Sequence, residues 1–260
     1  QTLYFPCMLA LRQESKNSCY KIMFWISLVD MLTLLVCSVF YGVGLLQGDV
    51  FCARPFWHFC LGAYGIGAAS CLGCLILVCN RMAELMNKGW IIEGIRTHLF
   101  LSAATLYGIV FALFTPPPLF NSAHQSFFFN PYIDYIYRNV PHAVNNLTVV
   151  ILSTFLYVYL CFIIFMKQVS EQLFDLGAMS TDVGRKRIIA SRAVFLQATV
   201  ICFGNFTSSI MYVYFNFFPT PPALIIFGQV AWQLGLSLQP LVYLLVNNKI
   251  RKYYVNLIGL

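Results

Sequence analysis

The sequence predicts an all-α membrane protein: a bundle of seven transmembrane helices, the first of which is largely missing from this chain. Hydrophobic residues make up 60% of the 260 residues and charged residues only 10%, and the mean hydropathy is +0.75. Soluble domains carry about 25% charged residues. Six apolar stretches are each long enough to cross about 30 Å of hydrocarbon. We therefore expect residues 1–260 to form one transmembrane domain.

The expected helices follow one another with mostly short connections. Residues 1–11 are apolar but too short to span a bilayer, so we interpret them as the inner end of the first helix. Spans two to seven are expected at residues 22–46, 56–79, 98–115, 143–166, 193–218 and 223–246. Residues 248–258 alternate apolar and basic side chains at helical spacing, which predicts an amphipathic helix against the lipids of the inner leaflet.

The basic residues orient these helices. Of the 16 Lys and Arg residues, all but Arg54 and Arg138 fall in one alternating set of loops and in the C-terminal tail. Cytosolic loops are the ones enriched in Lys and Arg, so we expect the N-terminus outside and the C-terminus in the cytosol. The net charge of +7 thus reflects membrane orientation, and no basic and aromatic pattern indicates nucleic-acid binding.

The third span is expected to be the central helix. Gly65, Ala69 and Gly73 recur at every fourth residue, which leaves one face with little side-chain bulk for neighbouring helices to approach. Arg81 follows the apolar run directly. A guanidinium at that position lies at the membrane edge, either in water or against a partner.

Polar residues at one depth suggest a buried network. Asp30 is the one acidic residue inside an expected span, so it is expected to face the bundle interior with a partner. A rise of about 1.5 Å per residue places Asp30, Ser70 and Gln239 about 12–16 Å above the cytosolic face. For Asp30 the alternatives are a neutral, hydrogen-bonded packing residue and a switch sensitive to a cation or a proton. For the three residues together the alternative to a network is chance alignment.

Prolines and aromatic residues shape the ends of several helices. Three prolines after Thr115 end the fourth span, and Pro240 is expected to free a backbone carbonyl and kink the seventh, one turn above Tyr243. The long aromatic loop up to Pro141 either caps a cavity or lies on the lipid headgroups. The cysteines mostly lie in apolar spans and do not form a disulfide framework; whether Cys52 is paired stays open.

A candidate ligand pocket lies in the outer third of the membrane. Tyr64 is about 25 Å above Arg81 along the third span. Polar and aromatic residues expected at the same level on other helices are Tyr41, Asn146, Tyr212, Gln229, Trp232 and Gln233. Each of them has core packing as its alternative role. Because no full charge points into this region, we expect a small, neutral and fairly apolar ligand.

Other functional classes are less well supported. An enzyme needs clustered His, Asp or Glu residues, which four scattered histidines and one buried aspartate do not supply, and nothing indicates a cofactor. The alternative is a multi-pass transporter of a small apolar solute. Transporters of this kind show internal repeats with matched interrupted helices, and the sequence contains no such duplication.

Several motifs resemble those of rhodopsin-like G-protein-coupled receptors. Asp30, Asn80-Arg81-Met82, Gln239-Pro240-Leu241-Val242-Tyr243 and the basic tail helix correspond in order to that family's Asp, Asp-Arg-Tyr, Asn-Pro-x-x-Tyr and eighth-helix marks. A closer resemblance, over nearly the whole chain, is to the nematode serpentine receptor class T family of presumed chemosensory receptors. The segments that carry it are residues 51–55 (FCARP), 80–84 (NRMAE), 124–131 (HQSFFFNP) and 142–146 (HAVNN).

The resemblance implies a chemosensory receptor of the plasma or ciliary membrane that binds its small-molecule ligand from the extracellular side and activates a heterotrimeric G protein. It implies that Arg81 and Tyr243 hold the cytosolic helix ends together, and that sodium binds near Asp30. The implied switch residues are Asp30, Ser70, Asn80, Arg81, Gln239, Pro240 and Tyr243. The implied G-protein contacts are Arg81, Arg185, Lys186 and Arg187.

The chain departs from the rhodopsin-like pattern at several positions. Asn80 replaces the acidic neighbour of the arginine, and Gln239 replaces an asparagine. The sixth span lacks a Trp-x-Pro motif, and the loop after the fourth span has no cysteine to pair with Cys52. These departures fit a divergent chemoreceptor better than a receptor for amines or peptides.

Overall fold

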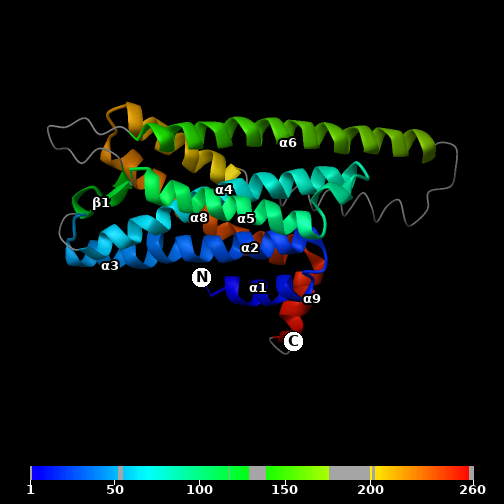
Figure 1. Ribbon diagram of the computed structural model, residues 1–260, viewed down its shortest axis with the longest axis horizontal. Coiled ribbons are helices and arrows are strands. Elements are labelled where there is room, and N and C mark those ends of the chain that lie inside the picture. Colours follow the sequence, from blue (N-terminus) through cyan, green and yellow to red (C-terminus); the bar gives the residue numbers. More distant parts are fainter. Residues whose placement is uncertain are drawn as a thin grey trace.

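The computed structural model describes residues 2–51, 55–116, 118–128, 139–175, 200 and 203–257. It is an all-α membrane bundle of long, roughly aligned helices with one small hairpin at its outer end (Figure 1). The helices are α1 (Tyr4–Gln13), α2 (Ser18–Leu34), α3 (Tyr41–Gln47), α4 (Pro55–Leu85), α5 (Ile95–Phe114), α6 (Val140–Asp175), α8 (Pro222–Val246) and α9 (Asn248–Leu257); residues 203–217 form a further helix.

Five helical segments of the described residues are long and apolar enough to cross a membrane. They are Ser18–Gln47, Gly65–Leu85, Ile95–Phe114, Val140–Met166 and Pro222–Val246. The expected span at residues 193–218 is described as a helix over 203–217, and most of its remainder lies outside the described residues. Helix α4 continues past the expected end at residue 79. Within this extension Arg81 and Glu84 form an ion pair at i, i+3 spacing, which stabilises the helix.

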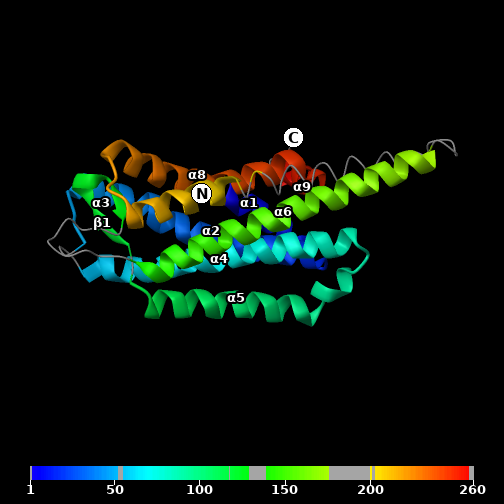
Figure 2. The same ribbon diagram turned by 90° about the horizontal axis from the view of Figure 1, so that it is seen from above.

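Helix α4 is the centre of the bundle. It packs against α2, α5 and α6, and Figure 2 shows it running between α2 and α5. The predicted close approach to its small residues is confirmed. A Cβ atom on Gly108 of α5 would lie 2.7 Å from Cβ of Ala69, so only glycine fits there.

The helix at 203–217 meets α8 through a second glycine contact. A Cβ atom on Gly204 would lie 2.8 Å from Cα of Gly235, so the two backbones touch without side chains between them. The structural reason for the glycine is the space that the neighbouring backbone needs.

A π-helix interrupts the outer half of the second span. Residues Leu35–Phe40 form it between α2 and α3, so the whole of Ser18–Gln47 is one helical segment with a local widening. A π-helical turn shifts the backbone register and leaves carbonyl groups to seek other partners. This turn places the Cys37 carbonyl where α8 contacts it.

A β-hairpin covers part of the outer end of the bundle. Strands β1 (Leu119–Asn121) and β2 (Ser126–Phe128) pair antiparallel, and Phe120 and Phe127 are buried with ring centroids 5.2 Å apart. Of the two alternatives for this loop, its described part therefore caps the bundle and does not lie on the headgroups. The rest of the loop, residues 129–138, lies outside the described residues.

The terminal helices meet at the opposite end, which the sequence predicts to be the inner, cytosolic one. Helix α9 packs against α1 and α8, and it turns across the bundle axis (Figure 1). Ile250 is buried, whereas Arg251 and Lys252 are exposed. This is the arrangement expected of an amphipathic helix at the membrane surface.

Candidate functional site

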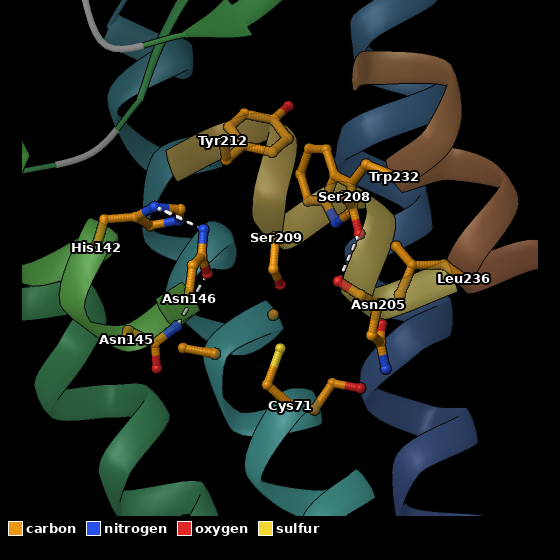
Figure 3. A pocket seen from close by; sticks show the side chains of 13 residues that line it. Cys71, His142, Asn145, Asn146, Asn205, Ser208, Ser209, Tyr212, Trp232 and Leu236 are labelled. Carbon is orange, nitrogen blue, oxygen red and sulfur yellow. Dashed lines mark hydrogen bonds between the residues drawn. The ribbon is translucent and has the colours of Figure 1, made fainter. Parts of the chain in front are cut away.

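A pocket inside the bundle lies between α4, α6, α8 and the helix at 203–217 (Figure 3). We call it the inner pocket, a name that refers to the interior of the bundle and not to its cytosolic end. Its cavity volume is about 50 Å³. The lining residues are Gly67, Ala68, Ser70, Cys71, His142, Asn145, Asn146, Asn205, Ser208, Ser209, Tyr212, Trp232 and Leu236. The small residues of α4 leave room for the cavity. Side chains of α6 and of residues 203–217 contribute amide and hydroxyl groups to its wall. None of the lining residues is an Asp, Glu, Lys or Arg.

One face of α6 forms a hydrogen-bonded chain along the inner pocket. His142, Asn145 and Asn146 share this face because they are three and four residues apart. Asn146 Nδ2 lies 3.1 Å from His142 Nδ1, and Asn145 Nδ2 donates to Asn146 Oδ1 at 3.2 Å. Tyr107 of α5 donates its hydroxyl to Asn145 Oδ1 at 2.6 Å. The chain therefore runs from α5 through α6 into the pocket.

Aromatic rings close the opposite wall. The Tyr212 ring meets the edges of Trp232 and His142 at centroid distances of 5.9 and 6.1 Å, in near-perpendicular contacts that such rings favour. Figure 3 shows Tyr212 and Trp232 side by side. The site combines a polar side with an aromatic side, as small-molecule sites usually do.

The structure brings only part of the expected pocket together. Asn146, Tyr212 and Trp232 line the inner pocket. Tyr41 does not; its hydroxyl donates to the Gln125 carbonyl of the hairpin at 2.8 Å. The side chain of Tyr64 lies outside the described residues.

Gln229 and Gln233 hold the π-helix and do not line the inner pocket. Both side chains donate to the Cys37 carbonyl, Gln229 at 3.0 Å. Gln229 also accepts from the Tyr212 hydroxyl at 3.3 Å. The side-chain amides of both glutamines are therefore hydrogen-bonded within the protein, because the π-helical turn presents the Cys37 carbonyl, which needs hydrogen-bond donors.

The expected polar network at the middle of the bundle comes together. Ser70 donates a short hydrogen bond to Asp30 Oδ1, and Asp30 is fully buried. Gln239 and Tyr4 face the same carboxyl group. Among the described residues, Asp30 Oδ2 and Gln239 Nε2 have no hydrogen-bond partner.

Tyr4 is a site residue that the sequence reasoning missed. Pro240 lacks an N–H, so the carbonyl of Leu236, four residues earlier, has no partner within the helix. The Tyr4 hydroxyl donates to that carbonyl at 2.6 Å. The predicted free carbonyl is thus confirmed, and its donor comes from α1. One turn further on, the buried Tyr243 hydroxyl donates to Gln239 Oε1 at 3.2 Å.

At the inner end of α4, Arg81 finds a partner on its own helix. Its Nη1 donates to Glu84 Oε2 at 3.2 Å, and Nη2 lies 3.9 Å from the Met23 sulfur. Glu84 therefore provides the acidic partner that Asn80 does not. The three-residue spacing between Arg81 and Glu84 in the sequence indicates such a pair. Asn80 is buried and donates to the Ile92 carbonyl at 3.4 Å. Arg185, Lys186 and Arg187 lie outside the described residues.

Comparisons with known proteins identify the family of this chain. The family model described as serpentine type 7TM GPCR chemoreceptor Srt matches residues 1–260. Serpentine receptor class T-55 of Caenorhabditis elegans is 23% identical over 251 residues, which are 92% of this chain and 65% of that receptor. The chain thus spans less than two thirds of the length of that relative. It belongs to the Srt family of serpentine seven-transmembrane chemoreceptors.

Proposed function

We propose that this chain forms the ligand-binding and signalling bundle of a chemosensory G-protein-coupled receptor. Its ligand is a small neutral molecule bound in the outer half of the bundle, and its cytosolic partner is a heterotrimeric G protein. One observation carries the proposal. Ser70 lines the inner pocket and also donates a hydrogen bond to Asp30, so a ligand in the pocket contacts the buried network directly.

The lining of the inner pocket supports a neutral ligand with hydrogen-bonding groups. Its side chains offer amides from Asn145, Asn146 and Asn205 and hydroxyls from Ser208 and Ser209. This lining is more polar than the sequence suggested. A cavity of about 50 Å³ has room for a few water molecules or a compact organic group of similar size. A carbonyl or hydroxyl compound meets both conditions.

Two routes connect the inner pocket to the rest of the bundle. The first passes from Ser70 to Asp30 and on to Gln239 and Tyr243. Oxygen donors of the Asp30 carboxylate and the Ser70 hydroxyl would hold a sodium ion there, since hard cations prefer oxygen ligands. The second route leaves through Tyr212, whose hydroxyl reaches Gln229 and so the π-helix. A ligand that favours one arrangement of these contacts shifts the receptor toward that state.

The pair of Arg81 and Glu84 is the proposed cytosolic lock. Their side chains keep 17% and 35% of their surface exposed, so the pair is accessible from the cytosol. A partly exposed ion pair contributes at most about 1 kcal/mol. Opening it is therefore easy, and it frees Arg81 for the G protein. Arg185, Lys186 and Arg187 are proposed to extend the same contact surface.

The test measures nucleotide exchange by a heterotrimeric G protein with the full-length receptor in lipid nanodiscs. We expect Asp30→Asn and Ser70→Ala to change basal exchange, because they alter the contact between pocket and network. Unchanged exchange in both variants would contradict the proposal.

A panel of small alcohols and ketones gives the ligand arm of the test. An activating compound is expected to lose its effect in Ser209→Trp, which fills the inner pocket. It keeps its effect in Ile210→Trp, whose side chain is 39% exposed on the outer surface of the same helix. Flux of the compound across the membrane without nucleotide exchange would support the transporter alternative.

A further inference from the structure

A larger cavity lies between α4, α5 and α6, and we call it the membrane groove. It has a volume of about 430 Å³. Its lining residues are Ala68, Leu72, Leu75, Tyr107, Phe111, Thr115, Pro141, Val144, Asn145, Thr148, Val149 and Leu152. Helices α5 and α6 pack mainly on α4 and hardly on each other, so the groove forms between them with α4 as its floor.

The membrane groove faces the bilayer. Its rim residues Val144, Leu152 and Tyr107 keep 57%, 44% and 37% of their surface exposed, on helices that span the membrane. The lining is mostly apolar, and its volume falls in the usual range for small-molecule sites, about 300–1,000 Å³. The groove therefore offers an apolar molecule dissolved in the membrane a place to bind.

The membrane groove and the inner pocket share two lining residues among the described part of the chain. Ala68 and Asn145 line both cavities. Ala68 contributes a single methyl group, so the Asn145 amide is the movable part of this wall. On the groove side its Oδ1 accepts from Tyr107, and on the pocket side its Nδ2 donates to Asn146. The Asn145 amide is thus hydrogen-bonded to groups of both cavities.

The hairpin limits approach from the extracellular side. Phe127 packs edge-on against Trp232 of the inner pocket wall at a centroid distance of 6.4 Å. Ser126 is fully buried, and its hydroxyl lies 3.5 Å from Gln229 Oε1. Within residues 118–128, the hairpin thus covers the wall of the pocket that faces outward.

We propose that the membrane groove and the inner pocket are two halves of one ligand site, entered from the lipid bilayer. The ligand class is a neutral amphiphile with one hydroxyl head and an aliphatic tail. The tail lies in the groove between α5 and α6, and the head takes the place of the Tyr107 hydroxyl on Asn145. This inference rests on the proposed function for the ligand's role as a signal. It replaces the extracellular route that the sequence suggested with a route through the membrane.

The experiment uses two photoreactive probes with the full-length receptor in nanodiscs. One is decanol with a diazirine on its tail, and the other is the matching decane with the same diazirine. Mass spectrometry locates the labelled residues. We expect decanol to label the residue 144–152 segment of α6. Val144→Trp, which fills the groove, lowers this labelling about tenfold. Leu147→Trp, at a position of similar exposure on α6 but outside the groove, leaves it unchanged.

Two substitutions at the wall shared by the cavities are expected to change decanol labelling in opposite directions. Asn145→Leu removes the partner of the alcohol head and is expected to lower decanol labelling about threefold to tenfold, the value of one hydrogen bond. Tyr107→Phe removes the competing hydroxyl and is expected to raise it. Decane labelling stays the same in both variants. Equal labelling by decanol and decane, insensitive to Asn145→Leu, would show that the groove holds only bulk lipid and would overturn the proposal.

Labelling is measured without a G protein, so this test is independent of signalling. A receptor that binds decanol as described but never promotes nucleotide exchange would overturn the proposed function alone. A receptor that signals normally but shows none of these labelling differences would overturn the membrane route alone.

Discussion

Replacing Tyr4 with phenylalanine removes the hydroxyl that donates to the Leu236 carbonyl. The hydroxyl of Tyr4 is buried and the bond is 2.6 Å long. A buried carbonyl left without a partner costs about 1–3 kcal/mol in proteins generally, and hydrogen bonds within membranes average about 0.6 with a maximum near 1.7 kcal/mol. We expect Tyr4→Phe to lower the free energy of unfolding by about 1–2 kcal/mol. Denaturation with sodium dodecyl sulfate in bicelles measures it on the full-length receptor.

A double-mutant cycle isolates the reason for this cost. Pro240→Ala restores the backbone N–H that bonds the Leu236 carbonyl within α8, so Tyr4 is no longer needed there. In the Pro240→Ala background we expect Tyr4→Phe to cost less than about 0.5 kcal/mol. Tyr41→Phe, whose hydroxyl bonds the hairpin near the surface, is the matched control. An equal cost in both backgrounds would refute the reasoning.

Two further predictions concern the inner lock and a backbone contact. Glu84→Gln removes the partner of Arg81 and should raise basal nucleotide exchange by up to about fivefold, since such a pair contributes at most about 1 kcal/mol; Glu93→Gln, on the exposed loop, serves as control, and equal exchange in the two variants would contradict the lock. Gly204→Ala inserts a methyl group against the α8 backbone and should destabilise the receptor by about 1–3 kcal/mol. Thermal unfolding checks this against Gly42→Ala, where a Cβ meets nothing within 4 Å; similar unfolding temperatures would count against the close contact.

The membrane helices and their depths were predictable because hydropathy and helical rise are local properties. A rise of about 1.5 Å per residue placed Asp30 and Ser70 at one level, and their side chains are hydrogen-bonded. Height along a helix does not fix rotation about its axis, since each residue turns by about 100°. Gln229 and Gln233 were placed at the correct end of the seventh span, but packing turns them toward the π-helix and away from the inner pocket.

The features that could not be predicted from the sequence depend on partners far away in the chain or belong to very short elements. The carbonyl freed by Pro240 follows from the sequence, but its donor, Tyr4, is 232 positions away from Leu236. The π-helix at Leu35–Phe40 depends on donors from α8 and has no local pattern of its own. The strands of the hairpin are three residues each, too short to produce the alternation that identifies a strand.

The unusual length of α6 determines how far a small motion at the inner pocket displaces the opposite end of this helix. Its 36 residues make a rod about 54 Å long that extends beyond the rest of the bundle at the inner end (Figure 2). His142, Asn145 and Asn146 all lie within its first two turns. A rotation of about 5° about that outer end displaces the far end by about 5 Å, by the geometry of a rod of this length. Rearrangements smaller than a bond length beside the inner pocket are thereby enlarged to the scale of a whole side chain at Asp175, the last residue of α6.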